Sequence, residues 1–256
     1  MNTTSQIYHY ISTSEEESKQ PEGNPNMWRY MDFPSFMSLI LDSSLLFKSL
    51  DKFEDASEGT LEDLMPFADS KHKEKSSKKG DNESNDLFIE QKKILQANRK
   101  CILVNSWSLD QKENYALWKI FLNGSKEGTA IKSNYDRLLK SLVENPDSEK
   151  DLNLSFYGSA VYYELEKMHS NNPLDNTVID IAGIKKPFYI YENEYRLIML
   201  ANKENKYGSA SPIYPSGVKM VEVNLDRLID KIYISPFADK WFVDLVRKVV
   251  KEKLTF

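Results

Sequence analysis

The chain has 256 residues, 40% hydrophobic and 12% aromatic, so it is long enough and apolar enough to bury a core. Its formal net charge of −5 argues against non-specific nucleic-acid binding, which usually needs a basic surface, although a local basic groove is compatible with it. A single cysteine excludes an intrachain disulfide and a cysteine-rich metal site, and no apolar run is long enough to span a bilayer. We therefore expect a cytoplasmic protein with no membrane partner.

The chain opens with a mostly polar arm, residues 1–26, and residues 27–256 are expected to form one α+β domain. WRYM at 28–31 has bulky residues on both faces and predicts a short strand. Asp32 can cap the helix that follows, because its carboxylate accepts from free backbone N–H groups. Pro34 sits just inside that helix start, where its missing N–H costs nothing. The apolar run LLF at 45–47 predicts a second strand.

An acidic loop follows at 51–59, with four carboxylates in nine positions. These oxygens could bind Mg²⁺ or Ca²⁺, although the spacing does not match an EF-hand loop. The favoured interpretation is a turn whose carboxylates cap backbone N–H groups and hold Arg29 or Lys119. Further on, residues of about 69–86 include no apolar side chain, which predicts a disordered insertion. A lysine cluster that touches nucleic acid is the alternative there.

The middle of the chain predicts a buried strand at 101–104 that ends in the sequence NSWS, followed by a helix from Lys112 to Phe121. A strand at 129–133 and a helix at 135–143 come next. Trp107 and Trp118 are more often core residues than platforms on which a ligand stacks, and helical spacing places Trp118 on a packed face.

The strongest candidate for chemistry is Glu192-x-Glu194-x-Arg196, ahead of the apolar run at 197–200. In a strand, alternate residues share a face, so the three side chains should point the same way. A cross-strand salt bridge on an exposed face is the simpler alternative. The C-terminal helix, predicted at 238–251, should bury Trp241, Phe242, Leu245, Val246, Val249 and Val250. Because strands and helices interleave without βαβ units, we expect an α+β fold with a mixed, mostly antiparallel sheet flanked by helices.

Seven motifs occur in order along most of the chain: WRYM (28–31), DKFEDASEG (51–59), SWS (106–108), LWKIF (117–121), GTAIKS (128–133), ENEYRL (192–197) and SPFADKWF (235–242). The ordered set resembles the prokaryotic family known as domain of unknown function 2971. That resemblance implies that the chain has the fold of this family, and it indicates no function.

The order of Arg29, then Ser106 and Ser108, then Glu192 and Glu194 is also similar to that of the arginine–serine–glutamate class of ADP-ribosyltransferases. This looser resemblance implies an ADP-ribosyltransferase-like core with NAD as substrate. No metal is expected, because no spacing of histidine and cysteine suggests zinc. Arg29 would bind the phosphates, Ser106 would orient Glu194 or the ribose, and Glu194 would stabilise the ribosyl cation. The other residues expected to line the nucleotide are Tyr30, Trp107, Ser108, Trp118, Lys119 and Arg196.

The resemblance implies a bacterial toxin or defence effector whose macromolecular target is unknown. The alternative is a non-enzymatic interaction or ligand-sensing module with the same fold. In an enzyme, Arg29 and Glu194 should line one cleft. In the alternative they should lie on opposite faces or be sealed in salt bridges.

Overall fold

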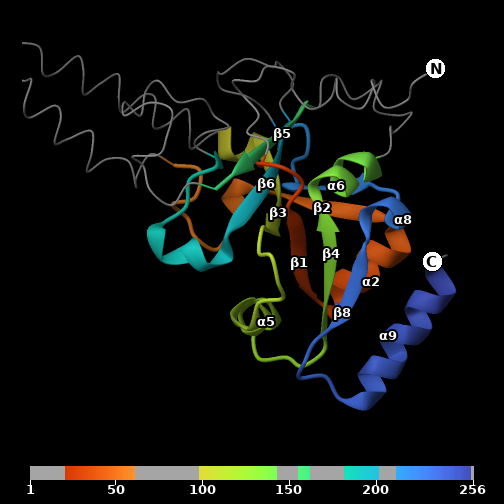
Figure 1. Cartoon of the computed structure of the whole chain (residues 1–256). Helices are drawn as coiled ribbons and strands as arrows, with labels where there is room; N and C mark the ends of the chain where they lie inside the picture. Colours follow the sequence, from red (N-terminus) through yellow and green to blue (C-terminus); the bar gives the residue numbers. More distant parts are fainter. Residues whose placement is uncertain (1–20, 61–97, 143–154, 162–181, 202–211, 255–256) are drawn as a thin grey trace, which may run out of the picture.

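The structure is a computed structural model, and it describes residues 21–60, 98–142, 155–161, 182–201 and 212–254. The predicted α+β class is confirmed (Figure 1). The elements, in chain order, are β1 (Asn26–Asp32), α2 (Phe33–Asp42), β2 (Ser44–Ser49), the 3₁₀ helices η1 (Leu50–Lys52) and η3 (Arg99–Cys101), β3 (Ile102–Ser108), α5 (Tyr115–Leu122), β4 (Gly128–Asn134), α6 (Tyr135–Ser141), β5 (Ser155–Ala160), the 3₁₀ helix η7 (Pro187–Glu192), β6 (Glu194–Leu200), β7 (Val218–Glu222), α8 (Leu225–Leu228), β8 (Lys231–Ile234) and α9 (Lys240–Lys253).

The eight described strands form one sheet in the order β5-β6-β3-β1-β4-β8, and all their described pairings are antiparallel. The strand β2 joins this sheet through β3 and carries β7 on its other edge. The sheet therefore forks at β3. One edge of β3 pairs first with β2, at Leu103 and Val104, and then with β1 at Ser108. We call the edge of β3 between these two pairings, residues 105–107, the fork.

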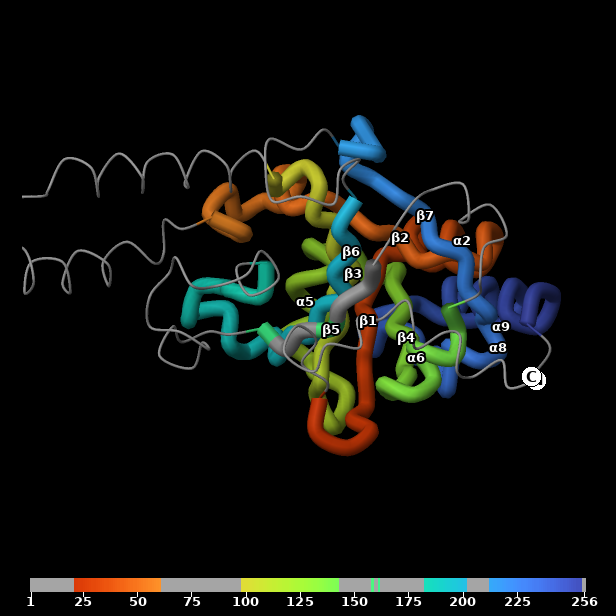
Figure 2. The backbone as a smooth tube through the Cα atoms, turned by 90° about the horizontal axis from the view of Figure 1, so that it is seen from above, coloured from red at the N-terminus to blue at the C-terminus, as the bar shows by residue number. Residues whose placement is uncertain are grey.

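The sheet separates two layers of the molecule (Figures 1 and 2). Helices α2, α6, α8 and α9 lie on one side, where the largest apolar core includes Phe36, Leu138, Leu228 and Phe242. The other side carries α5, η7 and the loop after η1, over two smaller apolar clusters. The candidate residues discussed below lie mainly on this second side.

Polar residues set the helix starts. The Asp32 carboxylate accepts from the Ser35 N–H at 2.9 Å, as the Asp32–Pro34 signal predicts. Three asparagines, Asn114, Asn134 and Asn224, cap α5, α6 and α8 in the same way. Each side-chain oxygen satisfies a backbone donor that the first helical turn leaves without a partner.

Two local predictions are wrong. The helix expected from Lys112 begins at Tyr115, because Asn114 is its extended cap. The C-terminal helix buries Phe242 and Val246, but the side chains of Trp241 and Leu245 are exposed. A 14-residue helix on the sheet surface can bury only one stripe of side chains, and Trp241 and Leu245 lie beside that stripe.

Some predictions lie outside the described residues: the arm up to residue 20 and the insertion at 69–86. Among the described segments, none of the helices combines the length and apolar character that a membrane span requires.

Candidate functional site

The Glu-x-Glu-x-Arg motif does not form one continuous strand. Glu192 ends the 3₁₀ helix η7, and β6 begins only at Glu194. Between them, Asn193 adopts a left-handed conformation with φ of 42°, which reverses the chain. The prediction that all three side chains share a strand face is therefore wrong for Glu192. Nevertheless, the turn brings Glu192 back to the same ammonium group that binds Glu194.

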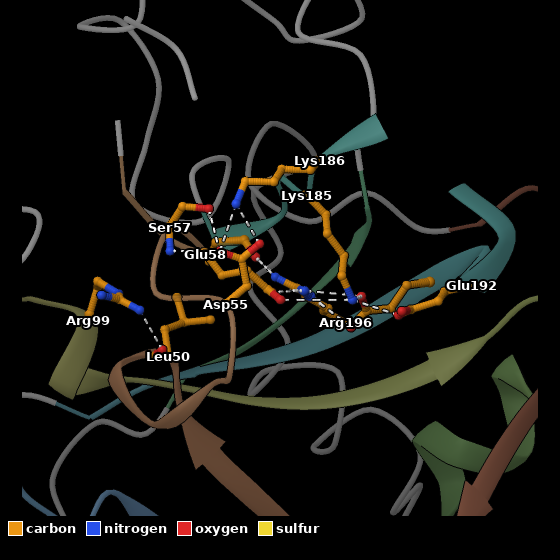
Figure 3. Close-up of polar contacts among 11 residues, drawn as sticks. Leu50, Asp55, Ser57, Glu58, Arg99, Lys185, Lys186, Glu192 and Arg196 are labelled. Atoms are coloured by element: carbon orange, nitrogen blue, oxygen red, sulfur yellow. Dashed lines mark hydrogen bonds and ion pairs between the residues drawn. The ribbon is translucent and has the colours of Figure 1, made fainter. Parts of the chain in front are cut away.

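Arg196 is the centre of a buried ion-pair network (Figure 3). It is fully buried, and its Nε and Nη2 donate to the two oxygens of Glu194 at 2.9 and 3.1 Å. Its Nη2 also donates to Glu58, and its Nη1 to the Ala182 carbonyl at 2.7 Å. One guanidinium thus ties together β6, the acidic loop and the segment before η7, because its planar fork presents several donors at once.

Lys185 is the second cation of the network, and it contacts Glu192 in addition to Glu194 and Glu58. Its Nζ donates to Glu192 at 2.6 Å and to Glu194 at 3.1 Å, and it lies 3.9 Å from a Glu58 oxygen. The ammonium also lies 4.6 Å from the centre of the Tyr189 ring, a favourable cation–π position. Lys185 is only 9% exposed, so three carboxylates and one aromatic face enclose a nearly buried charge.

The acidic loop is a turn that holds cations, as the favoured interpretation had it, but the cations differ from those predicted. Asp55 accepts from the Ser57 N–H at 3.0 Å and from Lys186 at 2.8 Å. Glu58 binds Arg196 and lies near Lys185, whereas the expected partners were Arg29 and Lys119. The reason is that the loop packs against β6 through Phe53, whose ring lies 5.6 Å from the Arg196 guanidinium carbon.

Burial and ion pairing move the pKa values of the two glutamates in opposite directions. Burial alone would raise the pKa of Glu194, but Arg196 and Lys185 outweigh it and lower the pKa to about 2. Burial raises the pKa of Glu192 above its ordinary value, and the nearby Glu194 and Glu58 add to this against Lys185. Glu194 therefore remains ionised at neutral pH, whereas Glu192 is the more readily protonated of the two.

Arg29 lies in the fork of the sheet. Its Nη1 donates to the Ser106 carbonyl at 2.7 Å, and its charge interacts with that of Glu194. Within the described segments, this is the one hydrogen bond of its guanidinium, which could donate five. Burial lowers the pKa of Arg29 to about 10, and the Glu194 charge offsets only part of that effect.

Arg29 and Glu194 nevertheless approach from opposite sides. Trp28 is paired with Ser108, and Ser108 with Glu194, so these three side chains share one sheet face. Because neighbouring strand residues alternate, Arg29 leaves β1 on the other face and its guanidinium enters the fork. Ser106 links the two residues: its carbonyl binds Arg29, and its side chain hydrogen bonds to Glu194. The structure thus brings Arg29, Ser106 and Glu194 together, but without a shared open face.

The aromatic candidates are core residues. Trp107 and Trp118 are 2% and 0% exposed, and their indole N–H groups donate to Asn105 and Glu113. The Tyr30 hydroxyl accepts from the Asn114 N–H at 2.8 Å, and its ring packs edge-on against Trp118. With rings packed on their faces and polar atoms already bonded, these side chains are not platforms for a ligand.

The two remaining candidates, Ser108 and Lys119, also lie outside the ion-pair network. Ser108 is buried and accepts a long hydrogen bond, 3.4 Å, from the Asp110 N–H. Lys119 lies away from the ion-pair network, with its ammonium 3.7 Å from the centre of the Phe237 ring. The structure brings together five of the residues expected to contact a nucleotide, around β3 and the Glu194 network: Arg29, Ser106, Glu192, Glu194 and Arg196.

Sequence reasoning missed Lys185, and it assigned Glu58 the wrong partner. A lysine next to a second lysine, before an apolar run, is an ordinary surface pattern, so no local signal indicates that Lys185 is buried. Asn105 was also missed: its amide donates to the Leu46 carbonyl at 2.8 Å and so links β3 to β2 at the fork.

Within the described segments, no three histidine, cysteine, aspartate or glutamate side chains are arranged as metal ligands. Comparisons with protein-family models, curated proteins and solved structures find no match to this chain. Both family resemblances therefore stay predictions, and the functional argument depends on the geometry of the residues.

Proposed function

We propose that this protein binds NAD or a related nucleotide at the fork, with the Arg29 guanidinium holding its phosphates. The observation that supports this proposal is that the Arg29 guanidinium has few hydrogen-bond acceptors near it among the described residues. Among the residues that the structure describes, its half-buried guanidinium has one hydrogen-bond partner, the Ser106 carbonyl, and burial lowers its pKa. A bound phosphate would supply the missing acceptors, because its oxygens match the guanidinium fork in a bidentate way.

An ADP-ribosyltransferase-like enzyme is the first form of this proposal. In it, the nearby Glu194 would stabilise the positive charge that develops on the ribose as nicotinamide leaves. The contact between Ser106 and Glu194, and the charge interaction between Glu194 and Arg29, support this form. The acceptor of the ADP-ribosyl group is not indicated by the geometry.

A ligand-sensing module that binds the nucleotide without consuming it is the second form, and a specific observation favours it. Glu194 is 6% exposed, and its two oxygens accept from Arg196, Lys185 and Ser106. A carboxylate with its acceptor sites filled in this way cannot also bind the ribose hydroxyls. For catalysis by Glu194, part of this network would have to open.

Calorimetric titration with NAD tests the binding. We expect Arg29→Met to weaken NAD binding at least tenfold, because it removes the guanidinium and keeps a side chain of similar length. Arg137→Met is the matched control, since Arg137 is also half-buried and donates to backbone carbonyls, those of Asp226 and Ile229. Wild-type protein that shows no binding at millimolar NAD would exclude the proposal.

Release of nicotinamide separates the two forms. If the enzyme form holds, wild-type protein releases nicotinamide and Glu194→Gln does not, while both bind NAD. Equal background release from both proteins, together with binding that depends on Arg29, would leave the sensing form.

A further inference from the structure

The segment from Ala182 to Glu192 crosses the ion-pair network and is attached to it at several points; we call it the strap. The Ala182 carbonyl accepts from Arg196, and Lys186 binds Asp55 of the acidic loop. Between them, Lys185 inserts its ammonium against Glu194. The first part of the strap is buried, with Ala182 and Ile184 in the interior, whereas the Phe188, Ile190 and Tyr191 side chains of its second part are exposed.

We infer that the strap is a lid over Glu194. Lys185 is its latch, because its ammonium holds the strap against the Glu194 carboxylate and occupies it. This inference rests on the proposed function, because a nucleotide held by Arg29 at the fork would have to extend to Glu194, which lies on the strap side of the sheet. In the enzyme form, Glu194 must be free to contact the ribose, but its carboxylate is already occupied; opening of the lid would remove this conflict.

The contacts of Glu194 fall into two sets. Arg196 and Ser106 extend from the sheet itself, from β6 and β3, and they hold Glu194 in place whether or not the strap is closed. Lys185 comes from the strap and occupies the same carboxylate oxygen, Oε2, that Arg196 also contacts. Withdrawal of the strap would therefore free an acceptor site on Glu194 without releasing the side chain from Arg196.

Glu192 positions the Lys185 ammonium from the outer end of the strap. Its Oε2 accepts from Lys185 at 2.6 Å, and within the described segments this is its one hydrogen bond. Glu192 and Lys185 both belong to the strap, so this contact moves with it. The contacts of Lys185 with Glu194 and Glu58 are those that opening would break. The charged partners around Lys185 from all packed elements are Glu58, Glu192, Glu194 and Arg196.

The matched pair Lys185→Met and Lys186→Met tests the latch in the full-length protein. The two lysines are neighbours in the same strap, but the Lys186 ammonium binds Asp55 and does not contact Glu194. If the lid restricts access, the apparent affinity is reduced by the fraction of molecules that are open. We therefore expect Lys185→Met to bind NAD about tenfold more tightly than wild type. Lys186→Met also removes a tie between the strap and the acidic loop, but its ion pair with Asp55 is more exposed, so it should change the affinity by a smaller factor.

Hydrogen exchange supplies a readout that does not depend on NAD. The N–H groups of Tyr189 and Asn193 bond to the carbonyls of Lys186 and Ile190. These bonds lie within the segment itself, so exchange reports the opening because η7 is expected to loosen once Lys185 no longer holds it against Glu194. We expect Lys185→Met to raise the exchange rate of residues 187–193 about tenfold, with no change in β3 and with a smaller increase in Lys186→Met. Glu192→Gln, which weakens the hold on Lys185 and leaves Glu194 intact, should raise exchange in the same segment if Lys185→Met does not fold.

The outcomes separate the lid from the nucleotide proposal. Faster exchange in the strap without NAD binding by any variant supports the lid and excludes the nucleotide proposal. NAD binding that depends on Arg29 but is unchanged by Lys185→Met, with unchanged exchange, overturns the lid and leaves the nucleotide proposal in place. Equal effects of the two lysine variants would also overturn the latch assigned to Lys185.

Discussion

Replacement of Arg196 by methionine is expected to lower the free energy of unfolding by about 3–5 kcal/mol. The substitution keeps most of the buried stem but removes a guanidinium that makes four hydrogen bonds, to Glu194, Glu58 and the Ala182 carbonyl. Loss of one partner leaves two buried carboxylates with Lys185 as their remaining cation, and uncompensated buried charge has a cost of this size. Because domains are stable by about 5–15 kcal/mol, the variant would be close to unfolding.

Urea denaturation followed by tryptophan fluorescence measures this loss, with Arg247→Met as the control. The Arg247 side chain is 74% exposed and lies 4.0 Å from Asp244, so its replacement should change stability by less than about 0.5 kcal/mol. The double variant Arg196→Met with Glu194→Gln should be more stable than the single one, since it removes an unpaired charge. If Arg196→Met costs no more than Arg247→Met, the network contributes nothing to stability and our account of it is wrong.

Three further predictions concern pH and backbone geometry. The pKa of Glu194 is about 2 in the folded protein, below its ordinary value of 4.5, so the stability it contributes is present above pH 4.5 and is lost toward pH 2. Denaturation at pH 7 and pH 3 should show a loss of a few kcal/mol in wild type and a smaller one in Glu194→Gln, since one pKa unit corresponds to about 1.4 kcal/mol. Gly158→Ala should cost about 1–3 kcal/mol, because the added Cβ would lie 1.9 Å from the Tyr195 hydroxyl oxygen. Adding Tyr195→Phe should recover part of that loss, and no recovery would rule out this clash. Ser43→Gly should raise the free energy of unfolding by about 0.5–1 kcal/mol, because Ser43 ends α2 with φ of 48°; a lower melting temperature would contradict this.

Most secondary structure could be predicted because its signals are local. Asp32 and Pro34 mark the start of α2, and apolar runs mark β2 and β3. The α+β class followed from their irregular order. Predictions failed where a single backbone angle decided the outcome, as at Asn193, whose left-handed conformation places Glu192 in η7 instead of β6.

The candidate site could be predicted only in part. Arg29, Ser106 and Glu194 were named from the order of motifs, and the structure brings them together around β3. Their accessibility could not be predicted, because it depends on Lys185, which lies in an unremarkable pair of lysines. The aromatic residues Trp107 and Trp118 were ambiguous until their burial in the core was known.

By itself, the sequence determined most of the elements, the capping role of Asp32 and the residue types that meet near β3, since these depend on neighbours a few positions apart. Only the tertiary structure decided which charges pair. The Glu58–Arg196 contact spans 138 positions, and Arg29 meets the Ser106 carbonyl across 77. Such pairings follow from strand order and from the fork at β3, where the sheet leaves an edge open for a side chain. Whether a carboxylate already has hydrogen-bond donors around it depends on these long-range contacts, so it cannot be predicted from a local sequence pattern.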